Sequence, residues 1–198
     1  MKIPIMTAAA LVSLSLAGLA PAEPPNLSGQ WRLDHRRSDD ARARIDAVAG
    51  SSQVKGGGAS GLTILPEGNT RSEVERVELR NWMLGIAGEL ETLEVSQTPE
   101  EIRLALGETV RIFYFGREHV RQDSEGRKLR CRVRWQGQQL MTEEDGEKGT
   151  RLRETFTHEP ANDWLVQAVY FASPLLKKPL ELRLVYTRDA SPAPAPAP

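Results

Sequence analysis

The sequence predicts a mainly β protein, an antiparallel up-and-down meander of about eight or nine strands that forms a barrel or half-barrel, with two short helices inserted after the first strand. Three observations support this prediction. From residue 90 to residue 188, apolar and polar side chains alternate in short runs. Gly, Pro, Asn or Asp separates these runs, as expected of hairpin turns. An earlier alternating run opens with a Gly-x-Trp sequence, Gly29 to Trp31.

The first 22 residues have the layout of a secretory signal peptide. Lys2 precedes an apolar run from Ile5 to Leu19, and the small residues Ala20-Pro21-Ala22 follow it, which predicts cleavage after Ala22. A retained membrane anchor is the alternative, but the run is short and contains polar residues. We therefore expect a bacterial protein that is periplasmic or secreted, with no transmembrane segment after cleavage.

One domain, residues 23–188, is expected between the signal peptide and a tail. Residues 189–198 contain a Pro-Ala repeat whose prolines cannot donate ladder hydrogen bonds, so we expect a disordered tail. The chain is 39% hydrophobic and 27% charged, which suits a globular core. Its formal net charge of −1 predicts no attraction to nucleic acid.

Two helices are expected before the meander, over residues 38–49 with Ser38 as the cap and over residues 72–87. The Gly/Ser-rich stretch 50–61 between them is expected to be an internal linker. Its glycine spacing matches a phosphate-binding loop, but Leu62 replaces the lysine that such a loop requires. The apolar positions are Ala41, Ile45, Val48 and Ala49 on the first helix and Val74, Val77, Leu79, Trp82, Met83 and Ile86 on the second.

Nine alternating runs define the expected strands in chain order. Each is bounded by turn-forming residues. The runs are 29–33, 92–97, 101–106, 109–115, 127–135, 139–144, 150–158, 163–171 and 180–188.

The Gly-x-Trp sequence followed by a meander resembles the calycin pattern of lipocalins. In that pattern the Trp closes the barrel floor, and a basic side chain from the last strand lies over it. The resemblance assigns these parts to Trp31 with Arg183 or Arg188. Such a cation–π contact contributes about 1 kcal/mol. Gly29, Trp31 and Arg183 are thus the expected barrel-closing residues.

A wider resemblance extends over most of the mature chain. Three motifs are similar to those of a large family of uncharacterised, exported, lipocalin-like (calycin-type) bacterial proteins. They are W-x-L-x-x-x-x-S-D from Trp31 to Asp39, R-W-x-G-x-x-L from Arg134 to Leu140 and V-Y-x-R from Val185 to Arg188. The resemblance implies a lipocalin-like barrel and export, and it implies no activity. The insertions after the first strand depart from a regular lipocalin, which leaves closure of the barrel open.

Large apolar residues that share one face of the strands are the expected barrel interior. In a wide barrel they would line a site for an apolar or amphipathic ligand, and in a tightly packed one they would be core. They are Trp31, Phe113, Val133, Trp135, Phe156, Val169, Leu182 and Leu184, with Val110 as an alternative to Phe113.

Five arginines alternate along two neighbouring predicted strands. On one face they would form a site for an anionic group such as a phospholipid head group, an acidic glycan or a carboxylate. The alternative, which we prefer, is a solvated outer face balanced by nearby glutamates. The arginines are Arg130, Arg132, Arg134, Arg151 and Arg153, and the glutamates are Glu143, Glu154 and Glu181.

Motifs that carry chemistry are few. His35, His119 and His158 lack the spacing of metal ligands, so we expect no metal site and no cofactor. Cys131, the single cysteine, falls on an apolar strand face and is expected to be buried. No nucleophile elbow or paired-carboxylate motif is present, so no catalytic residue is assigned.

Three functions remain open, in the following order. An exported protein that binds or carries a small apolar or amphipathic ligand predicts an apolar cavity beside the inserted helix. An envelope protein-interaction module without a small ligand predicts a filled core and an exposed apolar or basic patch. A calycin-type isomerase or hydrolase predicts a polar cluster inside the barrel, around His119, His158 or Tyr114. The fold alone does not choose among them.

Overall fold

The structure, a computed structural model, describes residues 23–50, 71–87, 91–123 and 126–189. Ten antiparallel strands form one sheet in the order β4-β3-β2-β1-β10-β9-β8-β7-β6-β5. The first and last strands of the chain therefore pair with each other, while β4 and β5 occupy the two edges. The result is a nearly closed up-and-down barrel. The predicted signal peptide, the linker beyond Gly50 and the tail beyond Asp189 lie outside the described residues.

The prediction of a mainly β meander with two helices after the first strand is confirmed. The helices are α1 (Ala41–Ala49) and α2 (Arg71–Ala87), and a 3-10 turn, η1 (Glu147–Gly149), joins two strands. The strands are β1 (Gly29–Leu33), β2 (Thr92–Gln97), β3 (Glu101–Leu106), β4 (Thr109–Tyr114), β5 (His119–Gln122), β6 (Lys128–Gln136), β7 (Gln139–Asp145), β8 (Arg151–Glu159), β9 (Trp164–Ala172) and β10 (Leu180–Arg188).

The strand missing from the sequence prediction is β5, which has four residues. Its pattern is reversed: His119 and Arg121 are half-buried, whereas Val120 is 62% exposed. Because apolar residues normally mark the buried face, this segment carries no alternation that predicts a strand.

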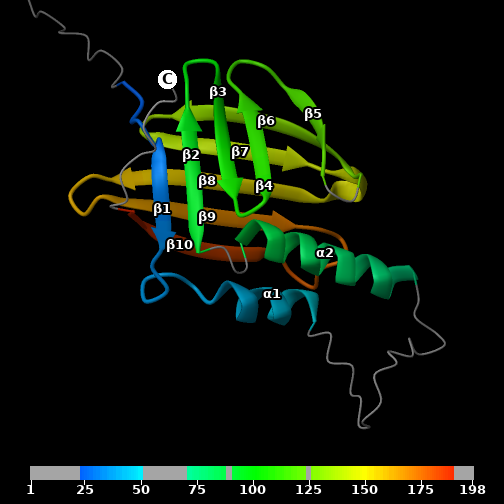
Figure 1. The fold of residues 1–198 in the computed structure, drawn as a ribbon. Coiled ribbons are helices and arrows are strands. Elements are labelled where there is room, and N and C mark those ends of the chain that lie inside the picture. Colours follow the sequence, from blue (N-terminus) through cyan, green and yellow to red (C-terminus); the bar gives the residue numbers. More distant parts are fainter. Residues whose placement is uncertain (1–22, 51–70, 88–90, 124–125, 190–198) are drawn as a thin grey trace, which may run out of the picture.

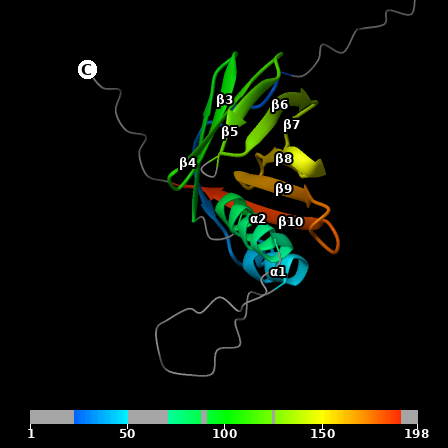
Figure 2. The same ribbon diagram turned by 90° about the vertical axis from the view of Figure 1, so that its right-hand side faces the viewer.

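The strands form two layers that cross steeply. Strands β1 to β4 run nearly vertically in Figure 1, and β7 to β10 run across behind them. The two helices lie together at one end of the barrel. In Figure 2, α2 lies between β4 on one side and β10 on the other, with α1 below it. Helix α1 packs on α2 and β10. No helix in the described ranges has the length and hydropathy needed to span a membrane.

The cap of helix α1 lies two residues later than predicted. The Asp40 side chain accepts a hydrogen bond from the Ala43 backbone N–H at 2.9 Å and is the actual cap. Ser38 instead binds β10, because its Oγ accepts the Val185 N–H at 2.9 Å. The predicted apolar face is otherwise correct, since Ala41, Ile45 and Val48 are buried.

Helix α2 buries only the second half of its predicted apolar stripe. Leu79, Trp82, Met83 and Ile86 are buried, but Val74 and Val77 are 49% and 44% exposed. The Trp82 ring holds α2 against the sheet, because it packs edge-on against Phe171 of β9 at 5.0 Å between ring centroids. In Figure 1 the first turns of α2 extend past the strands, which explains why its early valines stay exposed.

The cation–π contact expected at the barrel floor forms between Trp31 and Arg188. The Arg188 guanidinium carbon lies 4.2 Å from the Trp31 ring centroid, and Arg188 Nε donates to Asp163 Oδ2 at 3.0 Å. Of the two arginines that the lipocalin resemblance allowed, Arg183 is the wrong one. Its side chain lies on the outer face, where Nη1 donates to the Arg37 carbonyl at 3.1 Å.

Gly29 lies beside this contact, at a position where a side chain would collide with Arg188. Replacing Gly29 therefore tests the contribution of the contact to stability. Its φ is +143°, and a Cβ there would lie 2.5 Å from Arg188 Nη1. We expect Gly29→Ala to lower the free energy of unfolding by about 1–3 kcal/mol, through backbone strain and loss of the cation–π contact. Chemical denaturation measures this. The matched control is Gly85→Ala in α2, where no atom lies within 4 Å of the new Cβ and stability should not fall. Equal stability of Gly29→Ala and the unmodified protein would contradict the assignment.

Candidate functional site

The eight apolar residues predicted to face the interior do so, and they belong to one continuous core. Seven are buried, and Trp135 is half-buried at the edge of the core, where its ring stacks on Phe115 at 6.5 Å between centroids. Val110, the alternative to Phe113, points outward and is 47% exposed. The eight residues line neither of the two hollows described below.

The five predicted arginines share the outer face of β6 and β8, where acidic residues of β7 lie between them. Glu143 lies 3.2 Å from Arg132, 3.3 Å from Arg134 and 3.6 Å from Arg153, and Asp145 accepts from Arg151 at 2.8 Å. Arg130 pairs with Glu118 at 3.3 Å. Each of the five arginines therefore has an acidic partner on this face. One expected partner, Glu154, is on the opposite side of the sheet.

The histidines and the cysteine are dispersed. His35 contacts Glu91 on the surface, His158 contacts Asp163 near the floor, and the His119 ring lies 4.9 Å from that of Tyr114. Among the described residues, no group of three His, Cys, Asp or Glu side chains is arranged to hold a metal ion. Cys131 is buried as predicted, and burial, with the nearby Glu144 carboxylate, raises the pKa of its thiol to about 11.

A cluster of four charged side chains lies inside the barrel, and the sequence analysis missed it. This buried ion cluster consists of Arg111 from β4, Arg121 from β5, Glu144 from β7 and Glu154 from β8. Arg111 makes a two-point contact with Glu154, at 2.6 and 2.9 Å, and donates to Glu144 at 3.2 Å. Arg121 Nη2 donates to the other oxygen of Glu144. Arg111, Glu144 and Glu154 are each 1% exposed or less.

Neutral polar groups complete the hydrogen bonding of Glu154. Thr142 Oγ1 donates to one carboxylate oxygen at 2.9 Å, and Gln167 Nε2 donates to the other at 2.7 Å. Tyr186 Oη in turn donates to Gln167 Oε1 at 2.9 Å. With the two bonds from Arg111, Glu154 accepts four hydrogen bonds, which fills its usual acceptor capacity.

This environment keeps Arg111 charged and Tyr186 neutral. Although burial alone would lower it, the neighbouring Glu154 and Glu144 carboxylates raise the pKa of Arg111 above its ordinary value. Burial, together with the Glu154 charge, raises the pKa of Tyr186. Tyr186 therefore stays protonated at neutral pH and serves as a hydrogen-bond donor.

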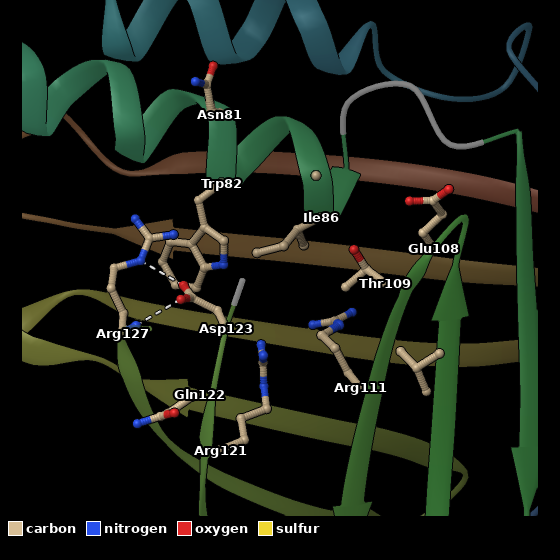
Figure 3. A pocket seen from close by; sticks show the side chains of 12 residues that line it. Asn81, Trp82, Ile86, Glu108, Thr109, Arg111, Arg121, Gln122, Asp123 and Arg127 are labelled. Carbon is tan, nitrogen blue, oxygen red and sulfur yellow. Dashed lines mark hydrogen bonds and ion pairs between the residues drawn. The ribbon is translucent and has the colours of Figure 1, made fainter. Parts of the chain in front are cut away.

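A hollow of about 300 Å³ opens beside this cluster, under the C-terminal half of α2. We call it the α2 hollow. Trp82 and Ile86 of α2 form its upper wall, and Arg111 and Arg121 lie on the opposite side (Figure 3). Asp123 and Arg127 pair at its edge at 2.6 Å. The other lining residues are Asn81, Gly85, Glu108, Thr109, Val110 and Gln122.

Two unsatisfied donors belong to side chains that line the α2 hollow. In the described part of the chain, the buried side-chain nitrogens without a hydrogen-bond partner are Arg111 Nε, Arg121 Nε and His119 Nδ1. All three belong to β4 or β5, the two strands that do not pair. Buried donors normally find partners, so this part of the interior has hydrogen-bonding capacity that the protein itself does not use.

A second hollow of about 290 Å³, here called the rim hollow, lies on the other side of Trp82. Leu79, Leu129 and Leu175 line it, and Lys148, which pairs with Glu75 of α2 at 2.9 Å, borders it. The Arg127 guanidinium carbon lies 4.9 Å from the Trp82 ring centroid. Trp82 and Arg127 line both hollows and so separate them.

A signal for the buried ion cluster was present in the sequence. On β8 and β9, Glu154 stands between Leu152 and Phe156, and Gln167 stands between Leu165 and Val169, each at a position where alternation requires an apolar residue. A polar residue at such a position predicts a polar interior, because the period of two fixes the face.

No family model and no curated protein match the chain. Among solved structures, similar ones include the REP1-NXSQ fatty acid transporter (15% identity, 82% of this chain and 96% of that one, TM-score 0.47). Apo lipid binding protein 8 of Caenorhabditis elegans is also similar (14% identity, 82% and 94% coverage, TM-score 0.48). At these values neither ligand nor activity transfers to this chain.

The buried ion cluster predicts a large effect of removing one member. Glu154→Ala leaves the Arg111 charge with one shared partner, so we expect the free energy of unfolding to fall by about 3–5 kcal/mol. Arg130→Ala, which removes an exposed ion pair, should change it by less than about 1 kcal/mol. Urea denaturation of both variants tests this, and equal effects would mean that the cluster does not stabilise the fold.

Burial and the raised pKa of Cys131 predict an unreactive thiol. A shift from 9.0 to about 11 lowers the thiolate fraction at neutral pH by about a hundredfold, and burial also blocks access. Iodoacetamide should therefore modify Cys131 at least that much more slowly in the folded protein than in guanidinium chloride. Mass spectrometry over a time course measures the rate, and comparable rates would show that Cys131 is accessible.

Proposed function

We propose that this protein binds a small amphipathic molecule in the α2 hollow. The observation that carries the proposal is the pair of unpartnered donors, Arg111 Nε and Arg121 Nε, on side chains that line a hollow whose opposite wall is apolar. Small-molecule sites combine an apolar wall with a few polar groups in this way. The hollow volume lies at the lower end of the range for such sites.

The walls of the α2 hollow suit an apolar body. Trp82 and Ile86 present a ring and an aliphatic side chain from above. Burying such surfaces against a ligand is favourable by about 25 cal/mol per Å² of apolar area. A ligand polar group would then lie toward Arg111 and Arg121.

The proposal moves the binding site from where the sequence suggested it. The eight predicted interior residues are packed as core, so we assign them a structural role and place the ligand at the gap between β4 and β5. Export to the periplasm or the medium remains part of the proposal, because the first 22 residues have the composition of a signal peptide. Such a location suits a protein that carries or sequesters a small molecule.

A protein-interaction module is the second candidate, and the exposed edge of β5 favours it. Val120 on this edge strand is 62% exposed, and an unpaired edge can accept a further strand. The two candidates differ in one measurement. Native mass spectrometry of the protein isolated from the cells that produce it shows a stoichiometric small molecule if the first is correct, and a bare mass or a protein complex if the second is.

A side chain that fills the α2 hollow tests the site itself. Gly85 lines the hollow and has open space around it, so Gly85→Phe places a ring at the mouth. With 1-aminoanthracene, a small uncharged fluorophore, we expect binding to the unmodified protein and at least about tenfold weaker binding to Gly85→Phe.

The matched control is Val74→Phe on the same helix, because Val74 is exposed and lies outside the α2 hollow. It should bind the fluorophore like the unmodified protein. Equal binding by all three proteins would place the site elsewhere, and no binding by any of them would contradict the proposed function.

A further inference from the structure

Every cation that lines the α2 hollow already has a carboxylate partner. Arg111 is held by Glu154 and Glu144, and Arg121 by Glu144. The third, Arg127, donates from Nε to Asp123 Oδ2 at 2.6 Å and from its backbone N–H to Asp123 Oδ1 at 2.9 Å. The positive charges of the arginines that Figure 3 shows around the hollow are therefore neutralised by carboxylates of the protein itself.

The charges around the hollow add up to a slight excess of negative charge. Arg111, Arg121 and Arg127 face the four carboxylates of Glu144, Glu154, Asp123 and Glu108, of which the last two line the hollow directly. A carboxylate or phosphate entering the hollow would lose its hydration and find no guanidinium charge that is still to be neutralised. Burial of an anion without such compensation is costly.

The unused hydrogen-bonding capacity is of a different kind. What Arg111 and Arg121 still offer is an N–H donor at Nε on each side chain, both buried and both without a partner. Their charges are neutralised by the bonds made at the other guanidinium nitrogens. Such donors suit a neutral acceptor, for example the oxygen of an amide, ester, ketone or alcohol.

We infer that the α2 hollow selects uncharged amphipathic molecules whose polar group accepts hydrogen bonds, and that it rejects anionic ones of the same shape. The inference rests on the proposed function and names the ligand class of that site. The polar oxygen lies between the Arg111 and Arg121 donors, and the apolar part lies along Trp82 and Ile86. Glu144 and Glu154 set the selectivity, because they neutralise the two guanidinium groups from inside the barrel.

The test compares two ligands that differ in charge and hardly in shape. Octanamide and octanoate are each used to displace 1-aminoanthracene from the full protein at neutral pH, where octanoate is ionised. We expect octanamide to compete at least about tenfold more tightly. As the pH is lowered until octanoic acid becomes protonated, its competition should approach that of octanamide, whose own competition serves as the control for changes in the protein.

A variant shifts the selectivity in a known direction. Glu154→Gln removes one internal negative charge and leaves Arg111 with only the shared Glu144, so octanoate should gain about tenfold in affinity relative to octanamide. Glu143→Gln is the matched control on the outer face of β7, and it should leave the ratio unchanged. If Glu154→Gln does not fold, Asp123→Asn at the edge of the hollow should shift the ratio in the same direction.

The outcomes separate this inference from the proposed function. Octanoate competing as tightly as octanamide, or more tightly, would overturn the neutral-ligand inference while the binding site stands. An unchanged ratio in a folded Glu154→Gln variant would overturn the role of the internal carboxylates. Failure of 1-aminoanthracene and both octyl ligands to bind would overturn the proposed function, and the inference with it.

Discussion

A charged side chain inside the barrel is the constraint on which the surrounding structure depends. Arg111 is 1% exposed, and a guanidinium group at that depth is tolerated only when carboxylates neutralise its charge. Glu154 and Glu144 supply the partners, and Thr142 and Gln167 each donate a further hydrogen bond to an oxygen of Glu154. The need to neutralise Arg111 on β4 thus explains the polar residues inside β7, β8 and β9. Through Tyr186 the same network extends to β10.

The same arrangement accounts for the position of the hollow. Strands β4 and β5 do not exchange backbone hydrogen bonds, so side chains alone close the sheet between them. Arg111 from β4 and Arg121 from β5 meet at Glu144, which joins the two edges through a shared carboxylate. The α2 hollow lies beside these ion pairs, and Trp82 of α2 covers it. Arg111 and Arg121 thus both bridge the two edge strands and line the α2 hollow.

Most of the fold could be predicted from local pattern, and the candidate site could not. Strand β10 matches its predicted range of residues 180–188, and the other predicted strands shift by a residue or less at each end, because alternation and turn residues act locally. Strand β5 could not be predicted because its apolar residue, Val120, faces outward. The choice of Arg188 over Arg183 depended on register at the end of β10, where Arg188 lies opposite Trp31. The buried ion cluster joins β4 to β7 and β8, and no local pattern specifies which charged side chains meet across a barrel.

The pairing of β1 with β10 has a consequence for how the chain folds. Trp31 lies opposite Arg188, so the seam of the barrel joins the two ends of the domain. Contacts between such distant residues require closure of a very long loop, which slows folding relative to helical proteins of the same size. Until β10 is in place, β1 has a free edge and the Trp31 ring lacks its cover. The growing or unfolded chain therefore passes through states with exposed apolar surface. The time that passes before β10 pairs with β1 governs its tendency to aggregate.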